Sequence, residues 1–136
     1  MARTKRGSPD GPICSIIVDD RWREALTDIS RHRRTQVLYW MHRARRDLVL
    51  QTPLRTGQTT GSFALRSPVR PNPIASSLVD LVAVEGTTLH VRGLDCLDGT
   101  PLIDLKPERA SSDGSGRDPV RIDRSCALLY IQPGIA

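Results

Sequence analysis

Residues Gly61 to Pro107 read GSFALRSPVRPNPIASSLVDLVAVEGTTLHVRGLDCLDGTPLIDLKP, and this stretch sets two rigid, polar turns on either side of a β-hairpin. The first turn is RSPVRPNPI, Arg66 to Ile74. Its three prolines fix φ at about −65° and push the residues before them into extended conformations. The second is LDGTPLIDLKP, Leu97 to Pro107, in which Asp98-Gly99 indicates a turn that leads into a strand.

The rest of the chain predicts a mainly β protein. β-branched, aliphatic and aromatic residues favour strands over residues 13–18, 35–41, 62–65, 78–84, 88–92 and 102–105, and a last strand within 126–131. Residues 78–84 are apolar on both faces except at Asp80, which is typical of a strand buried on two sides. Glu85-Gly86 is expected to turn the chain into the next strand, and the polar residues 51–60 are expected to form a mobile loop.

One short helix is predicted over residues 21–29. Trp22, Ala25, Leu26 and Ile29 recur at the spacing of a single apolar helix face, after the possible capping residues Asp19 and Asp20. The apolar fraction is 38% and the aromatic fraction only 4%, so the core should be aliphatic. We therefore expect one small domain with a single aliphatic core and this helix packed on it.

The chain has no sequence signal for export or for a membrane. It contains no apolar run of the length that spans a bilayer, and its N-terminus lacks the apolar core of a signal peptide, which predicts a cytoplasmic protein without a membrane partner. Cys14, Cys96 and Cys126 are odd in number and widely spaced. We expect these cysteines to be reduced and structural, with neither a disulfide framework nor a metal site.

The charge is positive and carried by arginine. Twenty Lys and Arg residues against fifteen Asp and Glu residues give a net charge of +5. Arginines cluster between Arg21 and Arg46, in the runs Arg31-His32-Arg33-Arg34 and His42-Arg43-Ala44-Arg45-Arg46. Such a patch suits the phosphate groups of a nucleic acid, because guanidinium groups bind phosphate through two hydrogen bonds. An ordinary solvated surface in an arginine-rich composition is the alternative.

The two turns also carry a functional hypothesis. Proline and glycine fix the backbone of both turns, and the hairpin between them can bring their polar side chains together, as in many small-molecule sites. Alternatively, both turns only connect strands.

Both turns match the motifs of a known family. RSPVRPNPI and LDCLDGTPLIDLKP resemble the motifs of the TsaA-like (TrmO-type) β-barrel family, over roughly Pro12 to Pro107. The resemblance implies a single small β-barrel that binds S-adenosylmethionine and forms a homodimer. It also implies a methyltransferase that acts on the exocyclic amine of a threonylcarbamoylated adenosine beside the tRNA anticodon. Three segments follow from it: residues 1–12 as a flexible N-terminal segment, 13–107 as the barrel domain, and 108–136 as a loose tail.

The resemblance also assigns site residues. The positions that match the family's cofactor contacts are Met41, His42, Arg66, Ser76, Leu97, Asp98, Gly99 and Thr100. Asp98 and Asp104 are the carboxylates placed to accept the amine proton, and a backbone carbonyl is the alternative. The residues expected to hold the RNA substrate are Arg33, Arg34, Arg70, Asn72 and Lys106.

The chain departs from the family pattern at its N-terminus. The family's first strand is absent, and Thr4-Lys5-Arg6 stands where members have a Pro-Arg-Gln motif that contacts the cofactor. A missing strand exposes unpaired backbone groups at a barrel edge, unless the tail or a dimer partner covers it. The sequence therefore leaves three interpretations open: an active methyltransferase, a truncated or diverged member that binds cofactor or RNA without turnover, or a remnant that mainly dimerises or folds poorly.

Overall fold

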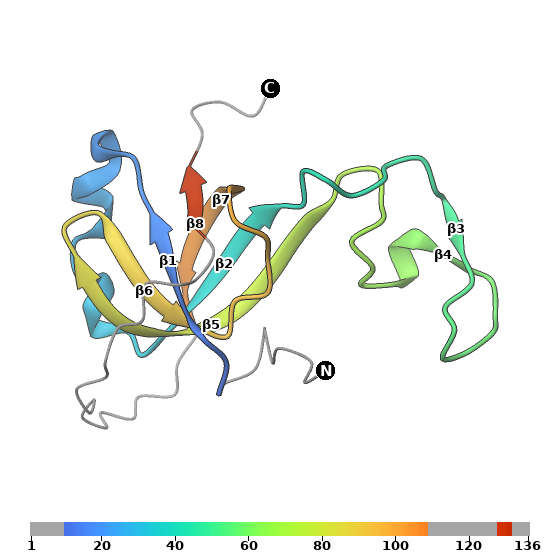
Figure 1. Ribbon diagram of the computed structural model, residues 1–136, viewed down its shortest axis with the longest axis horizontal. Helices are drawn as coiled ribbons and strands as arrows, with labels where there is room; N and C mark the ends of the chain where they lie inside the picture. Colours follow the sequence, from blue (N-terminus) through green and yellow to red (C-terminus); the bar gives the residue numbers. More distant parts are fainter. Residues whose placement is uncertain (1–9, 109–127, 132–136) are drawn as a thin grey trace.

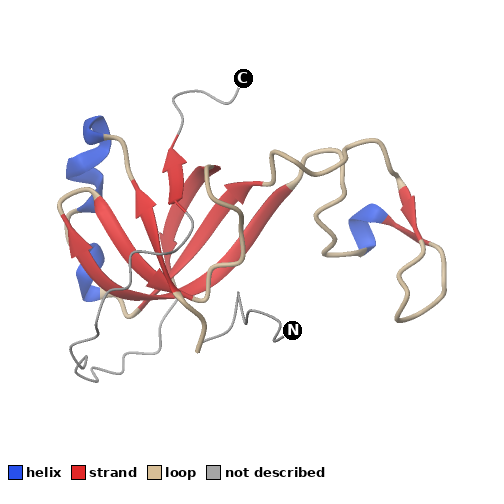
Figure 2. Cartoon of the chain, viewed as in Figure 1, coloured by secondary structure: helices blue, strands red, loops and turns tan. Residues whose placement is uncertain are grey.

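Six strands pair in a ring and form a closed barrel in the order β1-β6-β5-β2-β7-β8 (Figure 1). The computed structural model describes residues 10–108 and the backbone of residues 128–131. Most of the described chain is strand and loop, with three short 3-10 helices (Figure 2). The barrel strands are β1 (Ile13–Ile17), β2 (Arg34–Trp40), β5 (Ile74–Glu85), β6 (Thr88–Arg92), β7 (Thr100–Pro107) and β8 (Leu128–Ile131). The predicted mainly β barrel is thus confirmed.

Strand β2 lies between β5 and β7 in the barrel. It pairs antiparallel with β5 on one side and with β7 on the other. The β5–β6 hairpin turns at Glu85-Gly86 as predicted, and Gly86 adopts a φ of 60°, which a residue without a Cβ reaches easily. The two sequence motifs therefore flank β2, because RSPVRPNPI leads into β5 and LDGTP leads into β7.

The tail closes the barrel. Strand β8 pairs in parallel with β1, where Ser15 lies opposite Leu128, and with β7, where Thr100 lies opposite Leu129. The predicted last strand is thus confirmed, and the edge expected to lie open for want of a first strand is covered by the chain's own tail. Backbone groups on both neighbouring strands gain hydrogen-bond partners in this way.

The core is aliphatic, as expected. Ile16, Val37, Val79, Leu89 and Val91 are fully buried on the inner face of the barrel strands. Cys14 and Cys96 are buried with them, while Cys126 lies outside the described residues. Tyr39 is the aromatic residue of this described cluster, and its hydroxyl group needs a polar partner.

The predicted helix is present in a broken form. Two 3-10 helices, η1 (Asp20–Leu26) and η2 (Ile29–Arg31), replace a single helix over 21–29. Asp19 caps η1 by accepting a hydrogen bond from the amide of Arg21. Asp28 adopts a φ of 65°, and this left-handed conformation interrupts the helix. Of the expected apolar face, Leu26 and Ile29 pack on the core, whereas Trp22 stays 47% exposed.

Two strand predictions were wrong. Residues 62–65 do not form a strand, because Ser62–Ala64 form the 3-10 helix η3. The amide of Ser62 donates to the Val49 carbonyl, and its hydroxyl donates to the Leu48 carbonyl. Strand β5 is not buried on two sides either. Val79 and Leu81 face the core, but Leu78 is 46% exposed on the outer face. Leu78 lines a pocket on that face, described below.

Between β2 and β5 the chain leaves the barrel and forms an arm, residues 42–73 (Figures 1 and 2). The arm holds η3 and a two-stranded sheet of β3 (Leu50–Gln51) and β4 (Thr60–Gly61). The two strands take up the ends of the expected loop 51–60, and residues 52–59 between them are loop and turn. The Gln51 side chain fastens this arm by donating to the Ser62 hydroxyl at 2.9 Å and to the Val69 carbonyl at 2.6 Å. The arm therefore has structure of its own.

We expect Ile16→Ala to destabilise the protein by about 2–5 kcal/mol, because Ile16 is fully buried in β1 and its truncation leaves a cavity in the barrel core. Leu54→Ala is the matched control, since Leu54 is fully exposed on the arm and should change stability by no more than about 0.5 kcal/mol. Urea denaturation followed by circular dichroism measures both changes. Equal effects of the two substitutions would contradict the described core.

Candidate functional site

A pocket of about 650 Å³ lies where the arm rejoins the barrel. It is called the larger pocket below. Its walls come from the end of β2, the start of β5 and the RSPVRPNPI turn, with Asp95 from the loop before β7. The lining residues are Tyr39, Met41, Leu65, Arg66, Ser67, Pro68, Arg70, Asn72, Ile74, Ala75, Ser76, Ser77 and Asp95. The first sequence motif thus forms most of one wall of a cavity of ligand size.

Arg70 holds the proline turn together from within. Its guanidinium group donates to the carbonyl of Leu65 at 2.9 Å and to that of Ser67 at 3.3 Å. The Ser67 hydroxyl in turn accepts from the amide of Val69 at 3.2 Å. These bonds add to the rigidity that the prolines impose. Arg66, on the same turn, lies at the mouth of the pocket.

Arg46 ties the same turn to the end of β2. It donates to the Pro71 carbonyl at 2.6 Å and to the Asn72 side-chain oxygen at 3.1 Å. Its guanidinium carbon also lies 5.2 Å from the centre of the Trp40 ring, within the range of a cation–π contact. Two walls of the larger pocket are thereby held at a fixed separation.

Tyr39 lines the larger pocket, and its hydroxyl group is hydrogen-bonded. The Tyr39 hydroxyl lies 2.9 Å from the Ser77 hydroxyl and donates to the Asp95 carbonyl at 3.1 Å. Burial raises the pKa of Tyr39, so the phenol stays protonated at neutral pH.

Tyr39, Ser77 and Asp95 were not predicted from the sequence as site residues. The available signal was an aromatic hydroxyl in an aliphatic strand, which must find a polar partner when buried.

A second pocket of about 490 Å³ adjoins the first on the outer face of the barrel. It is called the smaller pocket below. Arg66 and Ser76 line both pockets, and the Gln36 amide donates to the Ser76 hydroxyl at 2.9 Å. The lining residues are Gln36, Arg66, Ser76, Leu78, Lys106, Pro107 and Glu108. Two cavities that share lining residues can hold two ligands side by side.

The structure brings many of the predicted site residues to these two cavities. Those that line the larger pocket are Met41, Arg66, Arg70, Asn72 and Ser76, and Lys106 lines the smaller one. His42 follows Met41 with an exposed side chain and lines neither. Arg33 and Arg34 lie at the opposite end of β2 from Met41.

The LDGT turn has the expected conformation but lies outside the lining of both pockets. The Thr100 hydroxyl donates to the Leu97 carbonyl at 2.6 Å, and Thr100 is buried. Gly99 adopts a φ of 77°, and a Cβ added there would meet nothing within 4 Å. Gly99 is therefore explained by the left-handed turn that it makes, and the close approach of a ligand is not needed to account for it.

The two candidate carboxylates differ in their surroundings. Asp104 accepts from the amide of Leu105 at 2.8 Å and pairs with the Lys106 ammonium at 2.7 Å, next to the smaller pocket. Asp98 is exposed in the turn before β7. Neither carboxylate lines the larger or the smaller pocket.

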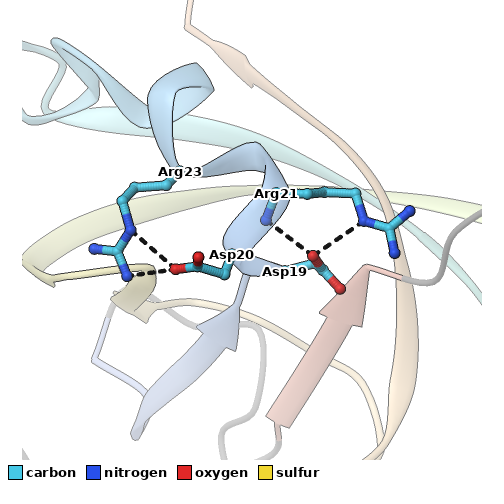
Figure 3. A network of polar contacts seen from close by, with 4 residues as sticks. All are labelled: Asp19, Asp20, Arg21 and Arg23. Atoms are coloured by element: carbon cyan, nitrogen blue, oxygen red, sulfur yellow. Dashed lines mark hydrogen bonds and ion pairs between the residues drawn. The ribbon is translucent and has the colours of Figure 1, made fainter.

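The arginine cluster is largely neutralised by neighbouring carboxylates. Figure 3 shows Arg21 paired with Asp19 and Arg23 paired with Asp20. The amide of Arg21 and its guanidinium group lower the pKa of Asp19. The remaining pairs join Arg31 to Asp28, Arg34 to Glu108 and Arg45 to Asp47. Within residues 10–108, Arg33, Arg43 and Arg46 have no carboxylate partner, so they carry the uncompensated charge of the cluster. Arg46 donates instead to the neutral oxygens of Pro71 and Asn72.

The described residues hold neither a metal cluster nor a membrane-spanning helix. No group of three or more His, Cys, Asp or Glu side chains lies close enough there to hold a metal ion. None of the helices in that part of the chain is long and apolar enough to cross a membrane.

Comparison with known proteins agrees with this architecture. Residues 5–114 match the family described as the tRNA-methyltransferase O N-terminal domain. The probable S-adenosyl-L-methionine-binding protein VirR of Rhizobium radiobacter is 47% identical over 79% of this chain and 62% of its own length. An S-adenosyl-L-methionine-binding protein of Archaeoglobus fulgidus is 39% identical over 75% of this chain and 73% of its own.

More distant relatives include an enzyme and a solved structure. The human tRNA (adenine(37)-N6)-methyltransferase is 44% identical over 47% of this chain and 14% of its own length. The crystal structure of TrmO from Pseudomonas aeruginosa is 27% identical, with a TM-score of 0.52, over 84% of this chain and 61% of that one. The chain thus spans less than two thirds of several of these proteins. From the matched residues, the shared motifs and the barrel, this chain belongs to the TrmO family, through the domain described as the tRNA-methyltransferase O N-terminal domain.

Proposed function

We propose that this protein binds S-adenosylmethionine and transfers its methyl group to the exocyclic N6 amine of an adenosine next to the anticodon of a tRNA. The observation that carries the proposal is the pair of adjoining pockets that share Arg66 and Ser76, built around the intact RSPVRPNP turn. The names of the relatives, S-adenosyl-L-methionine-binding proteins and tRNA (adenine(37)-N6)-methyltransferases, support the same chemistry. We propose the threonylcarbamoylated adenosine as the natural acceptor and the cytoplasm as the compartment.

The larger pocket fits the cofactor in size and in chemistry. Its volume of about 650 Å³ lies within the range of about 300–1,000 Å³ of small-molecule sites. Arg66 offers a guanidinium group to the cofactor's carboxylate, and Ser76 and Asn72 offer groups that bond to ribose hydroxyls. Met41 and Ile74 supply apolar surface for an adenine ring. We propose that His42 and the Leu97-to-Thr100 turn border this site without lining the cavity.

The bound cofactor supplies an electrophilic methyl group on a sulfonium, so that transfer forms the N6–C bond, breaks the S–C bond and leaves a thioether. The protein's part is to align the two ligands and exclude water, which lowers the barrier by several kcal/mol when reacting atoms are held in line. The N6 proton must also leave. We propose Asp104 as its acceptor, because Lys106 on the rim of the smaller pocket holds that carboxylate in place, and Asp98 is the alternative.

Turnover is favoured over a diverged domain that only binds. The sequence departs from the family pattern at the Pro-Arg-Gln motif, and an open barrel edge was expected. The motif residues Thr4-Lys5-Arg6 lie outside the described residues, but the edge is covered by β8. A closed barrel with both turns in place retains two adjoining pockets, and a domain that held cofactor alone would need only one.

We expect calorimetry to show binding of S-adenosylmethionine and of S-adenosylhomocysteine. Arg66→Met should weaken both by about tenfold or more, because a charge-assisted bond to the carboxylate is removed. Arg55→Met, on the exposed loop of the arm, is the matched control and should bind as the parent does. Gly99→Val should also weaken binding, because its φ of 77° strains a β-branched side chain. Absence of any heat at millimolar cofactor would refute the proposal.

We expect tRNA binding to depend on Arg33 and Arg43, because the third arginine without a carboxylate partner within residues 10–108, Arg46, is bonded to the proline turn. The double change Arg33→Gln with Arg43→Gln should flatten the slope of log affinity against log salt by about two units, because each phosphate that an arginine neutralises adds about one unit to that slope. The double change Arg21→Gln with Arg23→Gln is the control, because Asp19 and Asp20 already offset those charges. Filter binding over a range of salt concentrations measures both slopes. Equal slopes in the two variants would show that Arg33 and Arg43 are ordinary solvated surface.

We also propose that the protein is a homodimer that pairs through the arm. Val49, Leu50 and Phe63 are exposed on the arm, and Val49 and Phe63 line a largely apolar pocket of about 360 Å³. Large exposed apolar patches on soluble proteins usually mark contact surfaces. The barrel edge no longer supplies a reason for pairing, because β8 covers it.

Phe63→Ser is therefore expected to shift the protein from a dimer towards the 15.1 kDa monomer in sedimentation equilibrium, because Phe63 is 81% exposed in this patch. Trp22→Ser should leave the mass unchanged, since η1 lies on the far side of the barrel from the arm (Figure 1). A parent protein that sediments as a monomer at micromolar concentration would contradict dimer formation.

A further inference from the structure

We propose that the smaller pocket is the subsite for the nucleotide that accepts the methyl group, with Gln36 as the residue that selects adenine. This inference rests on the function proposed above and adds the binding site of the acceptor base and the side chain that reads it. Gln36, Leu78 and Glu108 lie outside the two sequence motifs, and their role follows from the pairing of three strands.

The smaller pocket is a platform on three neighbouring strands. In the sheet, Gln36 of β2 lies directly opposite Leu78 of β5 and opposite Lys106 of β7. Directly opposite residues point to the same side of a sheet, so these three side chains form one row across the outer face. Arg66 reaches this row from the proline turn and lines the same pocket.

The row has the chemistry that an unstacked base requires. Leu78 is 46% exposed, and together with Pro107 it offers apolar surface to the face of a ring. The Gln36 amide donates one hydrogen to Ser76, which fixes its plane and leaves its carbonyl oxygen and second hydrogen directed elsewhere. An amide held in this way pairs with adenine, by accepting from the N6 amine and donating to a ring nitrogen.

Charge at the rim favours a phosphate group. Glu108 is occupied by Arg34, which binds it through two bonds of 2.6 and 2.8 Å. Lys106 faces the pocket while paired with Asp104, and Arg66 has no carboxylate partner within residues 10–108. The balance at the pocket mouth is therefore positive, which suits the backbone on either side of a flipped nucleotide.

The shared lining residues place the two ligands next to each other. Arg66 and Ser76 line both cavities, so a base on Gln36 lies beside whatever fills the larger pocket. An N6 amine held by the Gln36 carbonyl would then face the shared wall. Gln36 acts here by positioning the acceptor, and it takes no part in bond making.

The test compares Gln36→Leu with the parent and with Gln58→Leu, whose side chain is exposed on the arm. Two RNA anticodon stem-loops serve as probes: one has adenosine at the position 3′ of the anticodon and the other has cytidine there. Fluorescence anisotropy measures their binding in the presence of S-adenosylhomocysteine, and calorimetry measures the binding of S-adenosylhomocysteine by itself. Thermal unfolding shows that each variant is folded.

We expect the parent and Gln58→Leu to prefer the adenosine stem-loop by about tenfold, and Gln36→Leu to lose that preference while binding S-adenosylhomocysteine within about twofold of the parent. An unchanged preference in Gln36→Leu, or an equal loss of S-adenosylhomocysteine binding, would overturn the assignment of the smaller pocket. Failure of the parent to bind S-adenosylhomocysteine would instead refute the proposed function, so the two failures are distinguishable.

A second variant keeps the proposal testable if Gln36→Leu folds poorly. Leu78→Glu places a carboxylate on the exposed face of β5 and should weaken binding of the adenosine stem-loop by about tenfold or more, because it removes apolar surface and repels phosphate. Leu54→Glu on the arm is its control. Equal affinities of these two variants for the stem-loop would count against the platform.

Discussion

The double pairing of β2 is the constraint on which the rest of the structure depends. Its hydrogen bonds to β5 and β7 fix which side chains of the strand point inward and which point outward. Thr35, Val37 and Tyr39 enter the core, while Gln36 turns to the outer face and meets Ser76. A shift of one residue in either pairing would bury Gln36 and expose Val37. Core packing therefore sets the register that the pockets require.

Rigidity at the larger pocket comes from two arginines that bind backbone carbonyls. Arg70 closes the proline turn on itself, and Arg46 fastens that turn to the end of β2. Each guanidinium group offers several donors in one plane, which suits carbonyls that no strand can pair. A pocket wall made from a loop can in this way hold a ligand as firmly as a wall made from a strand. Arg70 therefore has a structural role whether or not it also meets RNA.

The arginine-rich composition overstates the charge that is available to a nucleic acid. Five of the eight arginines between Arg21 and Arg46 face a carboxylate within 4.0 Å, and such exposed pairs add little to stability. The carboxylates nevertheless cancel most of the positive potential of the five arginines that they pair with. What remains positive is Arg33, Arg43, Arg46 and the rim of the smaller pocket. The proposed RNA contact therefore follows the pockets more closely than it follows the arginine runs.

The sequence by itself determined the strands of the barrel, the two turns and the family. Alternation of apolar residues, proline and Asp-Gly are local signals, and the segments around Ile16, Val37, Val79 and Leu89 carry them plainly. It failed where local signals conflict with packing: residues 62–65 have strand composition, yet Ser62 bonds to the returning chain and forms a 3-10 turn.

Only the tertiary structure decided what lies beside what. Tyr39 and Asp95 are far apart in the chain and meet in one hydrogen bond, and Gln36 joins Leu78 and Lys106 only through strand register. Strand β8 pairs between β7 and β1 because an unpaired edge costs backbone hydrogen bonds, and no local motif indicates which segment will take that position. Motifs name the residues of a site, but long-range pairing sets the distances between them.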